Sequence, residues 1–435
     1  MLLKGYVFNK GIRYVLTLAC LLALTSFSVG CAKTRVYNPL PAHLEDQVQV
    51  EGYENVRVWG DKDSPVLDNI AIESVKREIE ANGLESLKNP VAYLALSGGG
   101  ENGAFGAGVL CGWTAAGNRP EFKLVTGIST GALLAPFAFL GSDYDSQLKE
   151  VYTTVTDKDI YTKKSILTAY WRESVFDTKP LAKTIAKYVD EKVLAAVAEE
   201  YKKGRILLVG TTQLDAQRLV IWDMGAIASS RDPGALDLFR KVLLASASMP
   251  AVFPPVFINV TAEGSEYEEM HVDGGTVTEM MLYEEAIKPM TEHVKAIQSF
   301  IENKELLTSL KNRRRSLYII RNDLVTPEWD NVKPRLGNIA GRAISTLVKT
   351  HGEGDLYRIY VLALRDKIDY NLASIPKEVG EDTGEGMFNQ AFMQKLFDLG
   401  FDMAKNGYPW DKYPPGYQPV TETAPQAAPG ITSLR

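Results

Sequence analysis

Three short glycine-containing motifs constrain what this chain can fold into more than any other feature of its sequence. They are LSGGGENG at residues 96–103, GISTG at 127–131 and VDGG at 272–275. Each follows a short segment that is typical of a strand, and the first two precede apolar helical segments. The alternation of predicted strands and helices from 91 to about 275 predicts an α/β fold with a mainly parallel sheet between layers of helices.

The second motif contains a candidate nucleophile, Ser129. In a G-x-S-x-G sequence the serine occupies a sharp turn between a strand and a helix, and here Gly127 and Gly131 allow the two backbones to approach closely. An apolar helix is predicted to follow at 132–140. The free N–H groups at its start, including that of Thr130, would stabilise an oxyanion. The alternative for Ser129 is an ordinary helix N-cap.

The first motif predicts a loop of backbone N–H groups close to that serine. A predicted strand at 91–96 leads into Gly98, Gly99 and Gly100, and Gly103 completes a G-x-G-x-x-G pattern that is also found in nucleotide-binding loops. A nucleotide site would require an acidic residue at the end of a second strand about 20 residues further on, and none is present. We therefore interpret the three consecutive glycines as oxyanion-hole donors and keep nucleotide binding as a remote alternative.

The third motif supplies a candidate base, because a serine hydroxyl needs a proton acceptor within hydrogen-bond reach. Asp273 ends a predicted strand and is followed by Gly274 and Gly275; its alternative role is to cap a turn. The chain has four histidines, and none lies in a recognisable catalytic loop: His43, His271, His293 and His351. The second is expected to pack locally, two residues before Asp273 on the same strand face. The last two are expected at the surface, in a polar helical stretch and in a Gly/Glu-rich loop.

Taken together, the motifs resemble those of patatin-like phospholipases, a family of lipid acyl hydrolases. The resemblance covers residues 91–275 and includes ASASMPAVFPPV at 245–256. It implies a three-layer α/β/α fold with a mainly parallel sheet, in which a Ser129–Asp273 dyad cleaves a lipid ester through an acyl-enzyme without a metal or other cofactor. The family usually carries Arg or Lys where Asn102 stands, so a weaker activity is expected. A catalytically weak or inactive lipid-binding lipoprotein on the same fold is the alternative.

The N-terminus resembles a bacterial lipoprotein signal. Lys4, Lys10 and Arg13 precede an apolar stretch at 14–29, which is shorter than the roughly 20 residues that span a membrane. The stretch ends in SVGC, similar to a lipobox, in which Cys31 would carry acyl chains such as palmitate. The resemblance implies lipid anchoring in the bacterial cell envelope, at the outer membrane. Cleavage without lipidation is the alternative.

The sequence predicts four segments: a signal peptide at 1–30, a lipidated tether with a short helix at 31–89, an acyl hydrolase domain at 90–410, and a proline-rich disordered tail at 411–435. The predicted strands lie at 91–96, 122–126, 205–211, 217–223, 256–260, 268–272 and 316–322. The later predicted helices lie at 180–202, 336–350, 354–366 and 387–405. Strand 217–223 is expected to be antiparallel to 205–211, because only a short turn separates the two.

Composition excludes some partners. A net charge of −6 offers no basic surface for nucleic acid, and 45% hydrophobic residues suit a large globular core. With Cys20 removed in the signal and Cys31 acylated, Cys111 would be the single remaining thiol, and it is expected to be buried. The expected partners are therefore a phospholipid or another lipid ester and the membrane that holds the anchor. The sequence does not indicate the oligomeric state.

Overall fold

The computed structural model describes residues 36–62, 64–163, 174–282, 301, 304–379 and 386–419. Residues Pro41–Arg435 form one compact unit, distinct from Met1–Leu40. The predicted signal peptide, Cys31 and His293 lie outside the described residues. Within them, no helix combines the length and the apolar character that crossing a bilayer requires.

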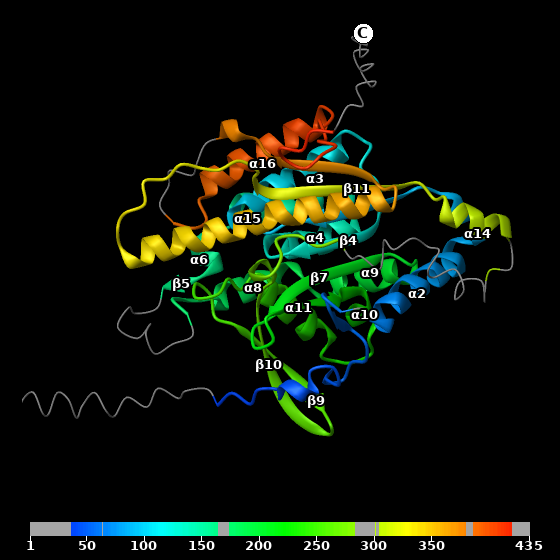
Figure 1. Cartoon of the computed structure of the whole chain (residues 1–435), viewed down its shortest axis with the longest axis horizontal. Helices are drawn as coiled ribbons and strands as arrows, with labels where there is room; N and C mark the ends of the chain where they lie inside the picture. The colour runs from blue at the N-terminus through cyan, green and yellow to red at the C-terminus, as the bar shows by residue number, and fades with distance from the viewer. Residues whose placement is uncertain are drawn as a thin grey trace, which may run out of the picture. The chain divides into compact units, whose positions relative to one another are not determined.

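A ten-stranded sheet forms the centre of the unit (Figure 1). Its strands are β1 (Gln49–Val50), β2 (Arg57–Trp59), β3 (Val91–Leu96), β4 (Phe122–Ile128), β7 (Ile206–Gln213), β8 (Arg218–Asp223), β9 (Val256–Ala262), β10 (Ser265–Asp273), β11 (Arg315–Leu324) and β12 (Asp369–Ile375). The main order is β1-β9-β10-β7-β4-β3-β11-β12, while β8 pairs with both β7 and β2. The five strands from β7 to β12 are parallel, and the others join antiparallel. A separate pair joins β5 (Thr162–Lys163) to β6 (Phe176–Asp177).

Helices cover both faces of this sheet. Alternate side chains of β3 point in opposite directions, so that Leu94 and Leu96 enter one apolar core while Tyr93 and Ala95 enter another. The first core packs against α3 (Gly103–Ala115), α4 (Thr130–Leu140), α5 (Asp145–Thr154), α8 (Lys179–Tyr188), α9 (Glu191–Lys202), α10 (Met224–Ser229), α11 (Ala235–Ser246) and α16 (Gln390–Lys405). The second packs against α2 (Pro65–Asn82) and α15 (Leu336–Arg365). The predicted three-layer α/β/α fold with a parallel centre is confirmed. Among the described residues, the other α-helices are α6 (Asp157–Ile160), whose Ile160 also joins the first core, and α14 (Lys304–Lys311).

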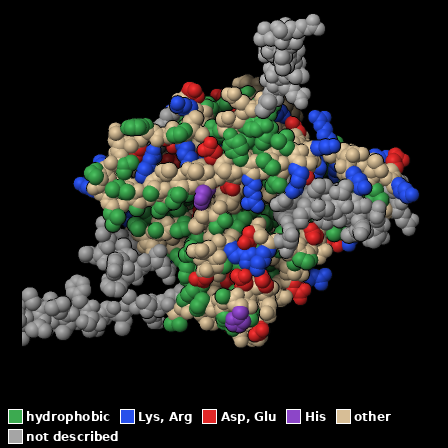
Figure 2. All heavy atoms as spheres, viewed as in Figure 1, with side chains coloured by type: hydrophobic (Ala, Val, Ile, Leu, Met, Phe, Trp, Pro, Cys, Tyr) green, Lys and Arg blue, Asp and Glu red, His purple; other side chains and the backbone are tan. Residues whose placement is uncertain are grey.

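Two predictions are wrong about where one helix ends and the next begins. The helix predicted at 180–202 is divided into α8 and α9, because the side chain of Asp190 accepts the N–H groups of Lys192 and Val193 and so begins a new helix. The helices predicted at 336–350 and 354–366 are instead the single helix α15. Its first half leaves apolar side chains exposed, and Figure 2 shows hydrophobic side chains gathered along that half and on the surface beside it.

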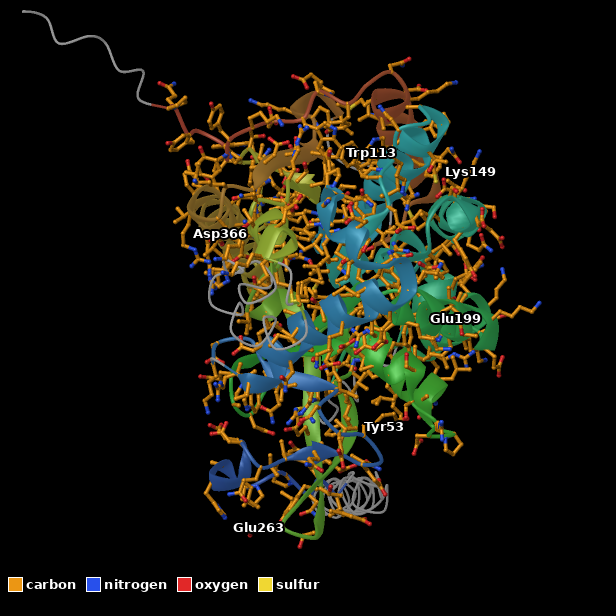
Figure 3. The ribbon with its side chains drawn as sticks, turned by 90° about the vertical axis from the view of Figure 1, so that its right-hand side faces the viewer. Tyr53, Trp113, Lys149, Glu199, Glu263 and Asp366 are labelled. Atoms are coloured by element: carbon orange, nitrogen blue, oxygen red, sulfur yellow. The ribbon has the colours of Figure 1, made fainter. Side chains whose placement is uncertain are left out.

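The predicted segment boundaries also move. The expected tether already belongs to the compact unit from Pro41, where β1 pairs with β9 and β2 with β8. Figure 3 shows Tyr53 and Glu263 at this same end of the unit. At the other terminus, Asp411 bridges to Leu372 of β12 and Tyr417 packs against Tyr360 of α15, so residues 411–419 are ordered parts of the unit. The seven predicted strands are all present, whereas β12 and the short strands β1, β2, β5 and β6 were not predicted.

Candidate active site

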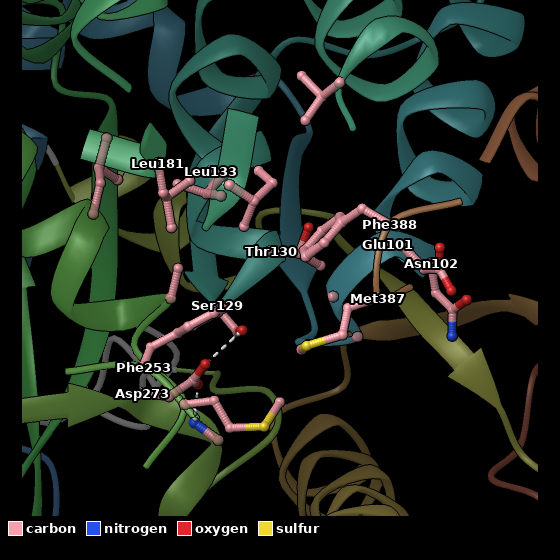
Figure 4. A pocket seen from close by; sticks show the side chains of 18 of the residues that line it. Glu101, Asn102, Ser129, Thr130, Leu133, Leu181, Phe253, Asp273, Met387 and Phe388 are labelled. Carbon is pink, nitrogen blue, oxygen red and sulfur yellow. Dashed lines mark hydrogen bonds between the residues drawn. The ribbon is translucent and has the colours of Figure 1, made fainter. Parts of the chain in front are cut away.

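The three glycine motifs meet at one edge of the sheet. β3 and β4 are parallel neighbours, with Leu96 opposite Gly127, so the loops that follow them emerge side by side. The last residues of β10 pair with β7, which places Asp273 opposite Thr211. In this arrangement the Ser129 hydroxyl donates a hydrogen bond of 2.6 Å to Oδ2 of Asp273, as Figure 4 shows. Two predicted site residues 144 positions apart in the chain are therefore in direct contact.

Ser129 occupies a sharp turn between β4 and α4. Its φ of 53° and ψ of −124° are unfavourable for a residue with a side chain, and such strain is typical of residues held for function. The Ser129 N–H donates to the hydroxyl of Ser246 at 3.0 Å, and that hydroxyl donates to the carbonyl of Gly210 at 2.7 Å. A Cβ atom at Gly131 would overlap the carbonyl oxygen of Leu96. The turn is thus fixed from two neighbouring strands.

Asp273 is buried, and its two oxygens have different partners. Oδ2 accepts from Ser129, and Oδ1 accepts the N–H of Gly275 at 2.8 Å. Burial raises the pKa of Asp273 to about 7, although both hydrogen bonds favour the carboxylate. A carboxyl group whose pKa lies near neutral pH can accept a proton and return it during one reaction cycle.

The glycine loop corrects one predicted role. The N–H of Gly98 donates to the carbonyl of Glu279 at 3.0 Å, so this donor is already occupied and cannot serve an oxyanion. Gly99 and Gly100 have φ values of 143° and 57°, conformations that glycine adopts without strain. Within the described part of the chain their N–H groups have no hydrogen-bond acceptor. Thr130 is the first residue of α4 and lacks an intrahelical acceptor. The candidate donors are therefore Gly99, Gly100 and Thr130.

Two buried polar residues that the motifs did not indicate support this loop and the dyad. Asn322, in β11, receives the N–H of Gly106 at 3.1 Å and donates its side-chain amide to the carbonyl of Ser97 at 3.0 Å. Ser246, at the end of α11, holds the backbone of Ser129. A polar residue within an apolar strand such as SLYIIRN was the available signal for Asn322, because buried amides need partners.

The histidines do not reach the dyad. His271 is buried, with Nδ1 2.9 Å from the Thr211 hydroxyl and Nε2 3.2 Å from Glu269, and burial lowers its pKa. The expectation that it is bonded locally agrees with these contacts. His351 lies on helix α15 and not in a loop; it is exposed and lines the cavity described next. Cys111 is buried as expected.

A cavity of about 640 Å³ opens onto the dyad. Its polar wall comprises the dyad and nearby groups: Ser129, Asp273, Glu279, Asp323 and the Gly99–Asn102 loop. Its apolar wall comprises side chains that include Leu133, Phe137, Leu181, Ile185, Leu243 and Phe253. Figure 4 shows Leu133 and Leu181 on one side of Ser129 and Asp273 on the other. Such a cavity suits a ligand that has one reactive polar group and a long apolar part.

Residues 94–287 match the family model described as patatin-like phospholipase. No curated protein matches the chain. Among solved structures, the chain is similar to VipD from Legionella pneumophila, with 12% sequence identity and a TM-score of 0.34 over 74% of this chain and 67% of that one.

Proposed function

We propose that this protein hydrolyses lipid esters with a Ser129–Asp273 dyad, and the match of residues 94–287 to the patatin-like phospholipase model supports the proposal. The observation that carries the proposal is the 2.6 Å hydrogen bond from the Ser129 hydroxyl to Asp273 at the polar wall of the cavity. A nucleophile on a strained turn, beside a buried base and free backbone donors, is the arrangement that acyl transfer requires.

The reaction follows from these contacts. Ser129 Oγ bonds to the ester carbonyl carbon while its proton moves to Asp273, and the carbonyl electron pair becomes an oxyanion near the free N–H groups of the glycine loop. Collapse of this intermediate breaks the bond to the alcohol, which takes the proton from Asp273 and leaves an acyl-enzyme. Water then attacks the acyl group, gives a proton to Asp273, and releases the fatty acid as Ser129 regains that proton.

The cavity favours a long acyl chain over a small polar acyl group. Its apolar wall is drawn from α4, α8, α11 and the segment that follows α11, and it lies next to Ser129. Burying each methylene of a chain contributes roughly 0.8 kcal/mol, so an extended chain adds binding free energy that a short one cannot. Phospholipids and other esters of long-chain fatty acids are the substrates that this wall supports.

We also propose that the protein acts at a membrane, anchored through acyl chains on Cys31 in the bacterial cell envelope. The proposal is supported by the basic, apolar and SVGC segments of the N-terminus. Mass spectrometry of the N-terminal peptide from the native host tests it. An acylated Cys31 is expected, and its loss in Cys31→Ala should release the protein from membranes.

Release of fatty acid from phospholipid vesicles tests the enzymatic proposal. The wild type should release fatty acid and react with a fluorophosphonate probe, whereas Ser129→Ala and Asp273→Asn should lower the rate by about 10³-fold or more. Ser146→Ala, which changes an exposed serine that does not line the cavity, should behave as the wild type. Lipid uptake without hydrolysis in the wild type would instead support the alternative of a lipid-binding protein, which Asn102 makes conceivable.

A further inference from the structure

A second carboxyl group, that of Glu279, lies beside the dyad and has no part in the reaction as derived above. Glu279 is only 7% exposed and lines the cavity. The backbone of Glu279 is held on both sides, since its N–H donates to Asp355 at 2.8 Å and its carbonyl accepts the N–H of Gly98 at 3.0 Å. The side chain is therefore fixed in the wall next to the glycine loop.

Three glycines leave the space that this side chain fills. A Cβ atom at Gly98 would lie 2.8 Å from Oε2 of Glu279, and one at Gly275 would lie 2.6 Å from Oε1. A Cβ atom at Gly352, on α15, would lie 3.2 Å from the Cβ and Cγ atoms of Glu279. Glycines from the first and third motifs therefore accommodate the same carboxyl group, which lies between the loop and the turn after β10.

The carboxyl group is also close to both members of the dyad. The Cβ atom that would contact Oε2 of Glu279, if added to Gly98, would lie 3.3 Å from Cβ of Ser129. The Cβ position at Gly275 that touches Oε1 is 3.1 Å from Oδ1 of Asp273. Because each pair of atoms contacts the same Cβ position, the Glu279 carboxyl group lies within roughly 6 Å of both Cβ of Ser129 and Oδ1 of Asp273.

No hydrogen bond satisfies this carboxyl group within the described residues. The charged groups that face it are the carboxyl groups of Asp273, Asp323 and Asp355, and the guanidinium of Arg321. Burial and the neighbouring carboxyl groups together raise the pKa of Glu279 well above its usual value. These surroundings favour the neutral carboxylic acid over the carboxylate, and the O–H of that acid would have no acceptor among the described residues until a ligand enters the cavity.

We propose that Glu279 is a catalytic residue that donates a hydrogen bond from its protonated carboxyl group to the carbonyl oxygen of the bound ester. The inference rests on the proposed lipid-ester hydrolysis. As Ser129 attacks and negative charge develops on that oxygen, the O–H of Glu279 adds a donor to the N–H groups of Gly99 and Gly100. No proton is transferred, so Asp273 remains the only base. A carboxyl group kept neutral by its surroundings is a strong donor to an oxyanion.

The proposal requires that, in the same site, Asp273 be ionised and Glu279 be protonated for the reaction to proceed. Asp273 must be ionised to accept the serine proton, so activity rises with pH through about 7. Glu279 must be protonated to donate, so activity falls again when it ionises and places a negative charge beside the oxyanion. The dependence of kcat/KM on pH should therefore be bell-shaped, with both limbs due to carboxyl groups.

The pH profile of kcat/KM with a soluble short-chain ester tests this role in three proteins. Glu279→Gln cannot ionise but keeps an N–H donor, so it should retain the acid limb, lose the alkaline limb and stay within about tenfold of the wild type at pH 7. Glu279→Leu has no donor, so its rate should fall by about 10²–10³-fold. An alkaline limb that persists in Glu279→Gln, or a Glu279→Leu rate equal to that of the wild type, would overturn the proposal. Unchanged thermal unfolding and fluorophosphonate labelling would exclude misfolding of either variant.

Infrared difference spectroscopy separates this inference from the proposed function. The wild type at pH 8 should show a protonated-carboxyl band that Glu279→Gln lacks and Asp273→Asn retains. If no ester is hydrolysed but this band is present, the hydrolase proposal fails while the protonation of Glu279 stands. If the band is absent, the inference fails whatever the activity.

Discussion

The polar and apolar walls of the cavity differ in how specifically their residues are determined. On the polar wall, specific contacts fix the dyad, such as the hydrogen bonds of 2.6 Å and 2.8 Å that hold the two oxygens of Asp273. On the apolar wall, side chains from several helices share only their hydrophobic character and the space they leave. The chemistry therefore depends on a few contacts, whereas the choice of substrate depends on the volume and apolar character of the cavity. Substitutions on the polar wall should therefore abolish reaction, and those on the apolar wall should redirect it.

Outside the dyad, the largest losses of rate are expected on the polar wall, as in Gly99→Ala. A Cβ atom there would overlap the carbonyl oxygen of Asn322, and the φ of 143° is accessible almost only to glycine. The loop must move, and the N–H of residue 99 moves with it. We expect kcat to fall by about 10²–10³-fold with a short-chain ester, as for the loss of an oxyanion donor.

Gly100→Ala is the matched control for that prediction. Its φ is 57°, and no atom lies within 4 Å of the added Cβ position, so the cost is limited to roughly 1–2 kcal/mol of backbone strain. Its kcat should stay within about tenfold of the wild type. Equal losses of kcat in Gly99→Ala and Gly100→Ala would show that overlap with Asn322 is not the cause of the loss.

Asp273→Asn should stabilise the protein while it abolishes activity. The pKa of Asp273 is raised to about 7 in the folded chain and is near 3.9 when unfolded, so between these values the unfolded chain is ionised while the folded chain keeps its proton. The wild type thus loses stability as the pH rises from about 4 to 7, by on the order of 2–4 kcal/mol. Asparagine does not titrate. Unfolding by urea should show the variant to be more stable at pH 8, with the difference disappearing at pH 4.

A smaller, selective effect is expected on the apolar wall from Leu181→Trp. Leu181 lies on α8 and is only 3% exposed, so the larger ring must extend into the cavity. We expect kcat/KM to fall about tenfold for esters of long acyl chains and to change little for butyrate esters. Leu181→Met conserves volume and should leave the chain-length preference unchanged. Equal losses for short and long chains would contradict the assignment of this wall to the acyl chain.

The sequence predicted much of the polar wall but not the apolar wall, because only the polar wall depends on particular residues at fixed positions. Ser129, Asp273 and the glycine loop were predicted because turns and close backbone contacts demand particular residues at fixed spacing. The apolar wall is assembled from segments far apart in the chain, and any hydrophobic residue of suitable size would serve, so no motif marks it. Glu279 was missed because only the folded chain shows that Gly98 and Gly275 make room for it. The occupied N–H of Gly98 could not be foreseen either, because its acceptor lies 181 positions away.

The smallest expected effect concerns the opening of the cavity, where the first half of α15 presents apolar side chains. Leu347 lines the cavity and is 59% exposed, whereas Val361 is 62% exposed on the second half of the same helix and does not line the cavity. A charge at Leu347 should oppose the approach of a lipid chain from a vesicle but not of a dissolved ester. We expect Leu347→Asp to lower hydrolysis of phospholipid vesicles about three- to fivefold and to leave hydrolysis of a soluble butyrate ester unchanged. Val361→Asp adds the same charge at similar exposure and should change neither rate. If both variants lose activity on vesicles alike, the whole exposed face of α15 contacts the lipid surface, and the difference between its two halves has no functional meaning.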